Sequence, residues 1–337
     1  MRFLKMVSVC LFSVSGCAAN TGLSSMTKDN QITSQNDTIK YRDEMRNFVI
    51  KISEYAKSTK PNFAIIPQNG IELVTLNGEI SGSPSTAYLK AIDANGQESL
   101  FYGYNGDNKA TPKDTKDYTV DFLNVSKANG NTILVTDYCY SAHKVSESYS
   151  KNAALGFVSF AAPERDLNLI PNKDFPIFNE NTEDILTIKQ AKNFLYLLNL
   201  ENFDTKSEFL SAIQNTNYDV ILIDLFFNDG QQFTSEEILK LKTKANGSGR
   251  LVVAYMSIGE AEEYRFYWQK AWKNTNPLWL DKENQDWKGN FKVKYWNADW
   301  QKIILGSENA YLDKILNANF DGVYLDIIDG FEYFEEE

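Results

Sequence analysis

The chain has 337 residues and a formal net charge of −11, from 45 acidic and 34 basic side chains. This length can bury a large core, either in one α/β barrel domain or in two domains. The negative charge argues against nucleic acid as a partner, because phosphate binding needs a basic face. The chain has one histidine, His143, which argues against a histidine-based metal site or a Ser-His-Asp triad, so we expect no metal or cofactor.

Residues 1–17 have the pattern of a bacterial lipoprotein signal. Arg2 and Lys5 give a positive start, an apolar run follows over residues 6–14, and two small residues precede Cys17. We expect Cys17 to be the lipidated first residue of the mature protein; an ordinary signal peptide is the alternative. The lipid would be the membrane anchor, and the location extracytoplasmic, at the outer membrane if the host is Gram-negative.

Residues 18–40 are rich in Ser, Thr, Asn and Gln without apolar periodicity, which is typical of a flexible tether. From residue 41 apolar side chains recur at spacings of three and four, so we expect a helix over residues 41–58. Cys139 is then the one cysteine of the mature domain, which excludes a disulfide within it.

Short apolar runs then alternate with helical patterns. The runs cover residues 63–66, 100–102, 133–135, 194–198, 220–223, 251–254, 293–295 and 323–325, and the helical patterns include 118–128, 206–214, 236–244 and 310–318. Eight such units predict a (β/α)8 TIM barrel over residues 41–337. A ninth run at 156–160 is expected to be an extra strand or a buried loop, and residues 163–183 a long surface connection.

The domain would begin with a helix and end with a strand, whereas a conventional barrel does the opposite. If the barrel is closed, the helix at residues 41–58 follows the strand at 323–325 in space. The two ends of the domain should therefore be neighbours.

Polar side chains cluster at the ends of the expected strands: Glu98 precedes the run at 100–102, and the others follow their runs. These residues are Gln68, Asn69, Glu98, Asp137, Asp224, Tyr255, Glu260, Asp326 and Asp329. Each could be a cap or a supporting group, and Asp326 could cap a following helix or act in catalysis. Together they predict an acidic, amide-lined mouth, because a barrel gathers its strand ends on one face.

Glycoside hydrolysis is the chemistry that needs carboxylates alone, one to protonate the leaving oxygen and one to attack or stabilise the anomeric carbon. All six tryptophans fall within residues 268–300. Their rings could stack on sugars, or they could pack an insertion.

Several segments resemble glycoside hydrolase family 114. They are residues 252–265, 279–280, 293–296 and 320–329, with further likeness at 63–70, 98–102 and 135–138. The resemblance implies a TIM barrel with endo-α-1,4-polygalactosaminidase activity. In the family arrangement the segment like 320–329 runs on into the one like residues 48–70, so the chain looks like a circular permutation.

The resemblance also implies a catalytic pair, Asp326 and Glu98. We expect Asp326 as nucleophile or stabiliser and Glu98 as acid/base, with the order of roles open. Further residues would line the sugar subsites or hold the pair: Asp224, Tyr255, Glu260, Arg265 and Asn69. The prediction is a lipid-anchored glycosidase acting on an amino-sugar polysaccharide; the alternative is a surface lipoprotein that binds carbohydrate without turnover.

Overall fold

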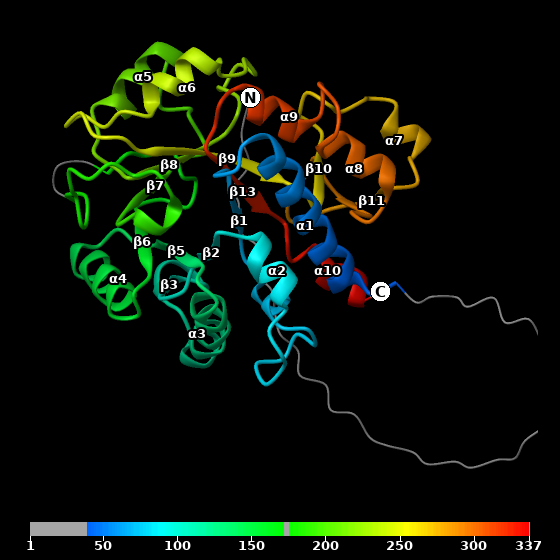
Figure 1. Cartoon of the computed structure of the whole chain (residues 1–337), viewed down its shortest axis with the longest axis horizontal. Helices are drawn as coiled ribbons and strands as arrows, with labels where there is room; N and C mark the ends of the chain where they lie inside the picture. Colours follow the sequence, from blue (N-terminus) through cyan, green and yellow to red (C-terminus); the bar gives the residue numbers. More distant parts are fainter. Residues whose placement is uncertain (1–38, 172–174, 337) are drawn as a thin grey trace, which may run out of the picture.

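The computed structural model describes residues 39–171 and 175–336 of the chain (Figure 1). The expected signal with Cys17, and the expected tether up to residue 38, lie outside the described residues. Within the described residues, we find no helix that combines the length and the apolar character needed to span a membrane.

Eight strands of the described chain run parallel to their neighbours, in two sheets. The five-stranded sheet has the order β1 (Ala64–Pro67), β13 (Gly322–Asp326), β9 (Leu251–Ser257), β8 (Val220–Ile223) and β7 (Phe194–Tyr196). The three-stranded sheet has the order β2 (Ala94–Glu98), β5 (Thr132–Tyr138) and β6 (Val158–Ala162). Most of these strands are rich in Val, Ile and Leu and buried throughout, as expected when helices cover a parallel sheet.

The two sheets meet at β1 and β2. Asn69 N donates to Gly96 O at 2.9 Å, and Asp93 N donates to Ile65 O at 2.9 Å. At the other junction β6 and β7 contact each other. The parallel strands thus follow one another in chain order, and β13 lies beside β1. The predicted α/β class with parallel strands is confirmed, and the arrangement is consistent with a TIM-barrel-like fold.

Helices separate most of these strands along the chain. They are α1 (Tyr41–Thr59), α2 (Thr86–Ala91), α3 (Lys113–Ala128), α4 (Ala142–Ala154), α5 (Lys206–Gln214), α6 (Ser235–Leu241), α8 (Ala298–Ile304), α9 (Tyr311–Asn317) and α10 (Gly330–Glu336), with 3-10 turns at Ile71–Val74 and Ile188–Gln190. The residues before two of them explain their starts: Thr205 accepts from Glu208 N, and Thr234 forms a capping box with Glu237.

Helices α1 and α10 lie side by side, blue and red in Figure 1, although they are far apart in the sequence. Arg42 and Glu335 form an ion pair across them at 2.9 Å. The expected proximity of the two ends of the domain is confirmed for the described residues.

An insertion lies between β9 and β13. Its antiparallel sheet consists of β10 (Glu260–Glu262), β12 (Asn290–Val293) and β11 (Leu280–Glu283), and the short helix α7 (Trp272–Thr275) precedes β11. Trp268, Trp272, Trp279 and Trp300 contact one another in series, with ring centroids 5.3, 4.9 and 5.1 Å apart. These four tryptophans therefore pack the insertion, as the packing alternative expected.

Two of the parallel strands expected from the sequence are not formed by the predicted residues. The strand expected at residues 100–102 is replaced by β2, whose sequence Ala-Asn-Gly-Gln-Glu is too polar to be recognised as an apolar run. Tyr102–Gly103 instead forms β3, in a hairpin with β4 (Gly106–Ala110). The run at 293–295 contributes to the antiparallel β12, because it belongs to the insertion.

Two other expectations are corrected. The ninth apolar run at 156–160 forms β6, a full member of the parallel sheet beside β5. The described chain ends in α10 after β13, so it does not end in a strand. The long connection over residues 163–183 has no helix or strand in its described part, as expected.

That connection is held by a buried ion pair. Lys244 and Asp219 are 2.6 Å apart, and both side chains are fully buried. Asp219 also accepts from Lys192 N at 2.7 Å, and Lys244 donates to Glu183 O at 2.8 Å. The pair thereby ties the connection to the start of β8.

Replacing Lys244 with Met should lower the free energy of unfolding by about 3–5 kcal/mol, because Asp219 would stay buried without its cation. Urea denaturation measures the loss. Lys113→Met is the matched control, since its pair with Asp117 lies on the exposed face of α3, and it should change stability little. Equal losses in the two variants would contradict the prediction.

Candidate active site

Glu98 ends β2, and its carboxylate is held by three side-chain donors. Oε2 accepts from Gln68 Nε2 at 2.5 Å and from Asn69 Nδ2 at 3.3 Å, while Oε1 accepts from the Tyr138 hydroxyl. Gln68 Oε1 accepts in turn from Tyr196 Oη at 3.2 Å. Four parallel strands, β1, β2, β5 and β7, or the residues directly after them, therefore contribute to one network. It fixes the direction of the Glu98 side chain and stabilises negative charge on it.

Asp326 ends β13 and is 4% exposed. Its Oδ2 accepts from Tyr255 Oη at 2.6 Å. Burial raises the pKa of the Asp326 carboxyl to about 7; the Tyr255 hydrogen bond acts in the opposite direction, and the charge of Glu98 raises it further. A carboxyl with this pKa can hold or release a proton at neutral pH, as general acid–base catalysis requires.

The backbone is strained directly after the candidate side chains. Ser99 follows Glu98 with φ of 58°, and Ile327 follows Asp326 with φ of 56°. This region is rare for any residue with a side chain and an outlier for a β-branched one. Gly259 makes room for the second kink, because a Cβ there would lie 2.1 Å from Ile327 O. Strain at both strand ends is typical of a functional site.

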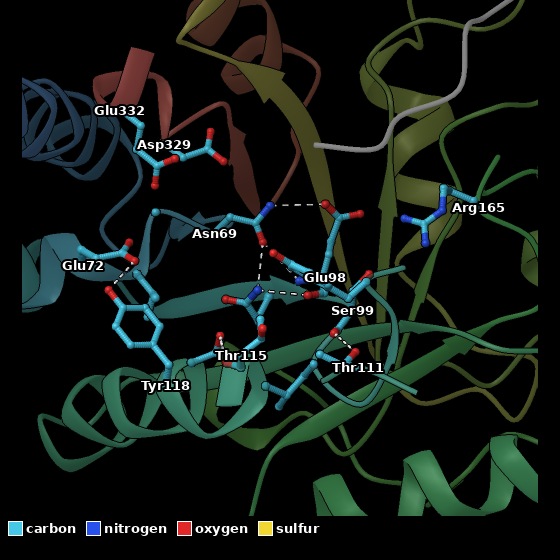
Figure 2. Close-up of a pocket in the computed structure, with 16 residues that line it drawn as sticks. Asn69, Glu72, Glu98, Ser99, Thr111, Thr115, Tyr118, Arg165, Asp329 and Glu332 are labelled. Atoms are coloured by element: carbon cyan, nitrogen blue, oxygen red, sulfur yellow. Dashed lines mark hydrogen bonds between the residues drawn. The ribbon is translucent and has the colours of Figure 1, made fainter. Parts of the chain in front are cut away.

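A pocket of about 120 Å³ opens beside Glu98 (Figure 2). Glu72, Asp329 and Glu332 contribute further carboxylates to its wall, and Arg165 contributes one guanidinium. Burial, followed by the charges of Glu332 and Asp326, raises the pKa of the Asp329 carboxyl. The carboxylates of Glu72, Glu98 and Glu332 against the guanidinium of Arg165 favour a cationic ligand.

Asp224 and Arg265 lie away from this pocket, in a buried ion network. Arg265 Nη1 is 2.7 Å from Asp224 Oδ2, and its Nε is 2.6 Å from Glu262 Oε2. The Arg265 guanidinium lies 5.7 Å from the centre of the Tyr255 ring. These two residues can therefore support Tyr255, and through it Asp326, rather than line the pocket.

Glu260 and Asp137 are also placed apart. Glu260 is buried on β10, 2.7 Å from Lys292 Nζ. Asp137 faces α4, where Ser148 Oγ donates to it at 2.6 Å, because successive side chains of a strand point to opposite faces. Burial raises the pKa of the Asp137 carboxyl. Its neighbour Tyr138 faces the interior and reaches Glu98.

Some residues of the site had no signal of their own in the sequence. Tyr196 on β7 and Tyr324 on β13 are fully buried, with ring centroids 5.2 Å apart. The signal that could have found Tyr324 is its position two residues before Asp326, on the same side of the strand. Glu72 and Arg165 belong to connections, where a period of two or 3.6 gives no guidance.

No cluster of three or more His, Cys, Asp or Glu side chains suited to a metal ion occurs in the part of the chain that the structure describes. Cys139 is buried, and burial raises the pKa of its thiol to about 12, so the thiol is a poor nucleophile at neutral pH. The side-chain groups that the hydrogen bonds bring together here are carboxylates, amides and hydroxyls.

Residues 179–337 match the model of glycoside-hydrolase family GH114. This part of the chain, a little under half of it, is therefore similar to that family. The predicted resemblance is thereby confirmed for residues 179–337, a segment that contains Asp326. Glu98, Gln68 and Asn69 lie outside the GH114 match, so their assignment stays a prediction.

Three relatives share part of this sequence. An uncharacterized protein of Methanocaldococcus jannaschii is 43% identical over 162 residues, which are 46% of this chain and 43% of that protein. An uncharacterized protein of Deinococcus radiodurans is 42% identical over 123 residues, which are 36% of this chain and 37% of that protein. An uncharacterized protein of Thermotoga maritima is 38% identical over 148 residues, which are 43% of this chain and 41% of that protein. The chain thus matches less than half the length of each relative.

Asp326→Asn should gain stability relative to the parent protein as pH rises. The folded carboxyl has its pKa raised from 3.8 to about 7, so its ionisation destabilises the fold increasingly between pH 4 and 7. Asn does not ionise and can still accept from Tyr255. The difference in unfolding free energy should grow by on the order of 1 kcal/mol per pH unit and level off above pH 7.

Denaturant titrations between pH 4.5 and 8 test this expectation. Asp117→Asn is the control, because the exposed Asp117 carboxyl has a lowered pKa and stays ionised in this range. A difference for Asp326→Asn that does not vary with pH would contradict a buried carboxyl that titrates near neutrality.

Proposed function

We propose that the chain is a glycoside hydrolase that uses Asp326 and Glu98 as its carboxylate pair. The observation that carries the proposal is the coupling of these two groups: they end two parallel strands, and the charge of Glu98 helps to raise the Asp326 pKa to about 7. A buried carboxyl that can hold a proton near neutral pH, together with a second carboxylate held by hydrogen-bond donors, is the arrangement that glycosidic cleavage needs.

Their surroundings favour an order of roles opposite to the one expected from the sequence. Asp326 holds a proton below about pH 7 and would give it to the leaving oxygen as the glycosidic C–O bond breaks. Glu98, held by Gln68, Asn69 and Tyr138, would keep its negative charge to attack the anomeric carbon or to deprotonate a water. Water supplies the hydroxyl and proton of the products.

The substrate we propose is an amino-sugar polysaccharide with free amines. Glu72 and Glu332 beside Glu98 would attract ammonium groups, and the acidic chain as a whole would add to this field. Binding should therefore weaken with salt and on N-acetylation of the polymer, which removes the charge.

Carbohydrate binding without turnover is the second candidate. The observation that favours it is the burial of Asp326, which at 4% exposure is reached by a sugar only if the surroundings move. Binding of a polysaccharide with no increase in reducing ends would support this candidate over the hydrolase.

We also propose that the two parallel sheets close into one eight-stranded barrel whose order is permuted relative to the family. The hydrogen bonds between β1 and β2 and the contact of β6 with β7 support closure. The pairing of β1 with β13 is compatible with the permutation, because it places the unit of α1 and β1 directly after β13, as the family order of these segments requires.

Asp326→Asn and Glu98→Gln should each lower hydrolysis of an amino-sugar polysaccharide at least about 100-fold, because each removes a group of the reaction. Release of reducing ends measures the rate. Asp117→Asn, remote and exposed, should retain full activity. An aryl glycoside with a good leaving group separates the two roles, because its cleavage needs no general acid. The Asp326→Asn variant should still cleave it. If the Glu98→Gln variant cleaves it instead, the roles of the two residues are reversed.

We further propose that Cys17 is lipidated and anchors the protein outside the cytoplasm. The motif described for residues 1–17 supports this proposal. Cys17→Ser should move the protein from the membrane fraction to the soluble fraction and abolish incorporation of labelled fatty acid. Gly16→Ser is the control, because it places a serine beside the cysteine and leaves the thiol intact. Continued fatty-acid labelling of the Cys17→Ser variant would contradict the proposal.

A further inference from the structure

A tyrosine hydroxyl lies beneath both carboxylates without a hydrogen-bond partner among the described residues. This group is Tyr324 Oη, and the residue is fully buried. Tyr324 precedes Asp326 by two positions on β13, and Gly96 precedes Glu98 by two positions on β2, so each pair shares a face of its strand. A Cβ on Gly96 would lie 2.1 Å from Tyr324 Oη, so the hydroxyl rests against the Gly96 backbone, one layer below Glu98.

This position is costly for a hydroxyl. A buried hydroxyl without an acceptor has lost its water and gained no partner, and phenylalanine would fill the same space without that loss. The ring itself is well packed, with the Tyr196 ring centroid 5.2 Å away. The packing therefore accounts for an aromatic ring at position 324 but gives no reason for its oxygen.

The charges around Tyr324 supply a reason for a hydroxyl at this position. Burial, followed by the charges of Glu98 and Asp326, raises the pKa of the Tyr324 phenol well above its ordinary value. The phenol is thus neutral near neutral pH. Its O–H bond is free to rotate, because no acceptor among the described residues fixes it.

We propose that Tyr324 is a positioning residue whose neutral O–H dipole turns toward whichever of Asp326 and Glu98 carries the negative charge. The inference rests on the proposed function, in which charge moves between these two groups. As Asp326 gives up its proton to the leaving oxygen it becomes negative, and Glu98 loses charge as it bonds to carbon or takes a proton from water. The phenol keeps its own proton throughout and gains or loses no bond.

Tyr324→Phe tests the inference, and Tyr88→Phe is its matched control. Tyr88 is also fully buried with an unpartnered hydroxyl, but it lies on α2, where Arg46 is the charged group that affects its pKa. Both variants remove one buried, unpaired oxygen and should keep or raise the thermal midpoint. Tyr324→Phe alone should lower kcat, by about tenfold, with KM unchanged; a donor that touches the reacting atoms directly costs about 10²–10³.

The pH dependence separates positioning from packing. Loss of the dipole destabilises both carboxylates, so both limbs of the pH profile of kcat should move to higher pH in Tyr324→Phe and stay in place in Tyr88→Phe. Carbon-13 NMR titration of the Asp326 carboxyl, assigned with Asp326→Asn, should show the same upward shift of its pKa without any substrate.

The NMR titration also separates failure of this inference from failure of the proposed function. If the parent protein cleaves no polysaccharide but the Asp326 pKa rises in Tyr324→Phe, the hydrolase proposal fails and the positioning role stands. If Tyr324→Phe matches the parent protein in kcat, in pH profile and in the Asp326 titration, Tyr324 is a packing residue and the inference is overturned.

Discussion

The placement of β13 between β1 and β9 is the constraint on which the rest of the site depends. Leu325 is in register with Pro67 of β1, and Asp326 is in register with Ser257 of β9. Gln68 N donates to Leu325 O at 2.8 Å, and Ile258 N donates to Asp326 O at 3.1 Å. The backbone of Asp326 is thus fixed from both sides by segments distant in the sequence. Such pairings form late, because closing long loops costs entropy before contacts compensate it.

Successive side chains of a strand point to opposite faces, and this alternation decides which residues of each strand reach the site. Tyr324 and Asp326 share one face of β13, and the intervening Leu325 lies on the opposite face. On β5 the same rule separates Tyr138, bonded to Glu98, from Asp137, bonded to Ser148 on α4. A shift of one residue in register would exchange these roles, so the carboxylate network depends on register as strongly as the core does.

The sequence predicted six of the eight parallel strands and one of the two carboxylates of the proposed pair. Asp326 was found because a carboxylate that follows a buried run stands out. Glu98 preceded the run expected at 100–102 and was singled out by the family resemblance, whereas the structure places it at the end of β2. The polar β2 was missed because Gly96 and Asn95 are buried by neighbours that no local pattern reveals. Asp137 was grouped with the mouth because only the register shows which face a residue at a strand end takes. Tyr196 and Tyr324 were missed because an inward aromatic ring looks like ordinary core.

Burial of Asp326 destabilises the folded protein, but it also gives the carboxyl the raised pKa that the proposed reaction needs. Its raised pKa means that the charged form, which dominates above about pH 7, destabilises the folded protein, and the kink at Ile327 adds backbone strain in the same place. The rest of the fold must compensate both costs. A cation bound among the pocket carboxylates would act in the opposite direction, because a nearby positive charge favours ionised Asp326 and so lowers its pKa. An ammonium-bearing ligand would therefore stabilise the protein most above pH 7, where the carboxyl is charged, and a neutral sugar would not.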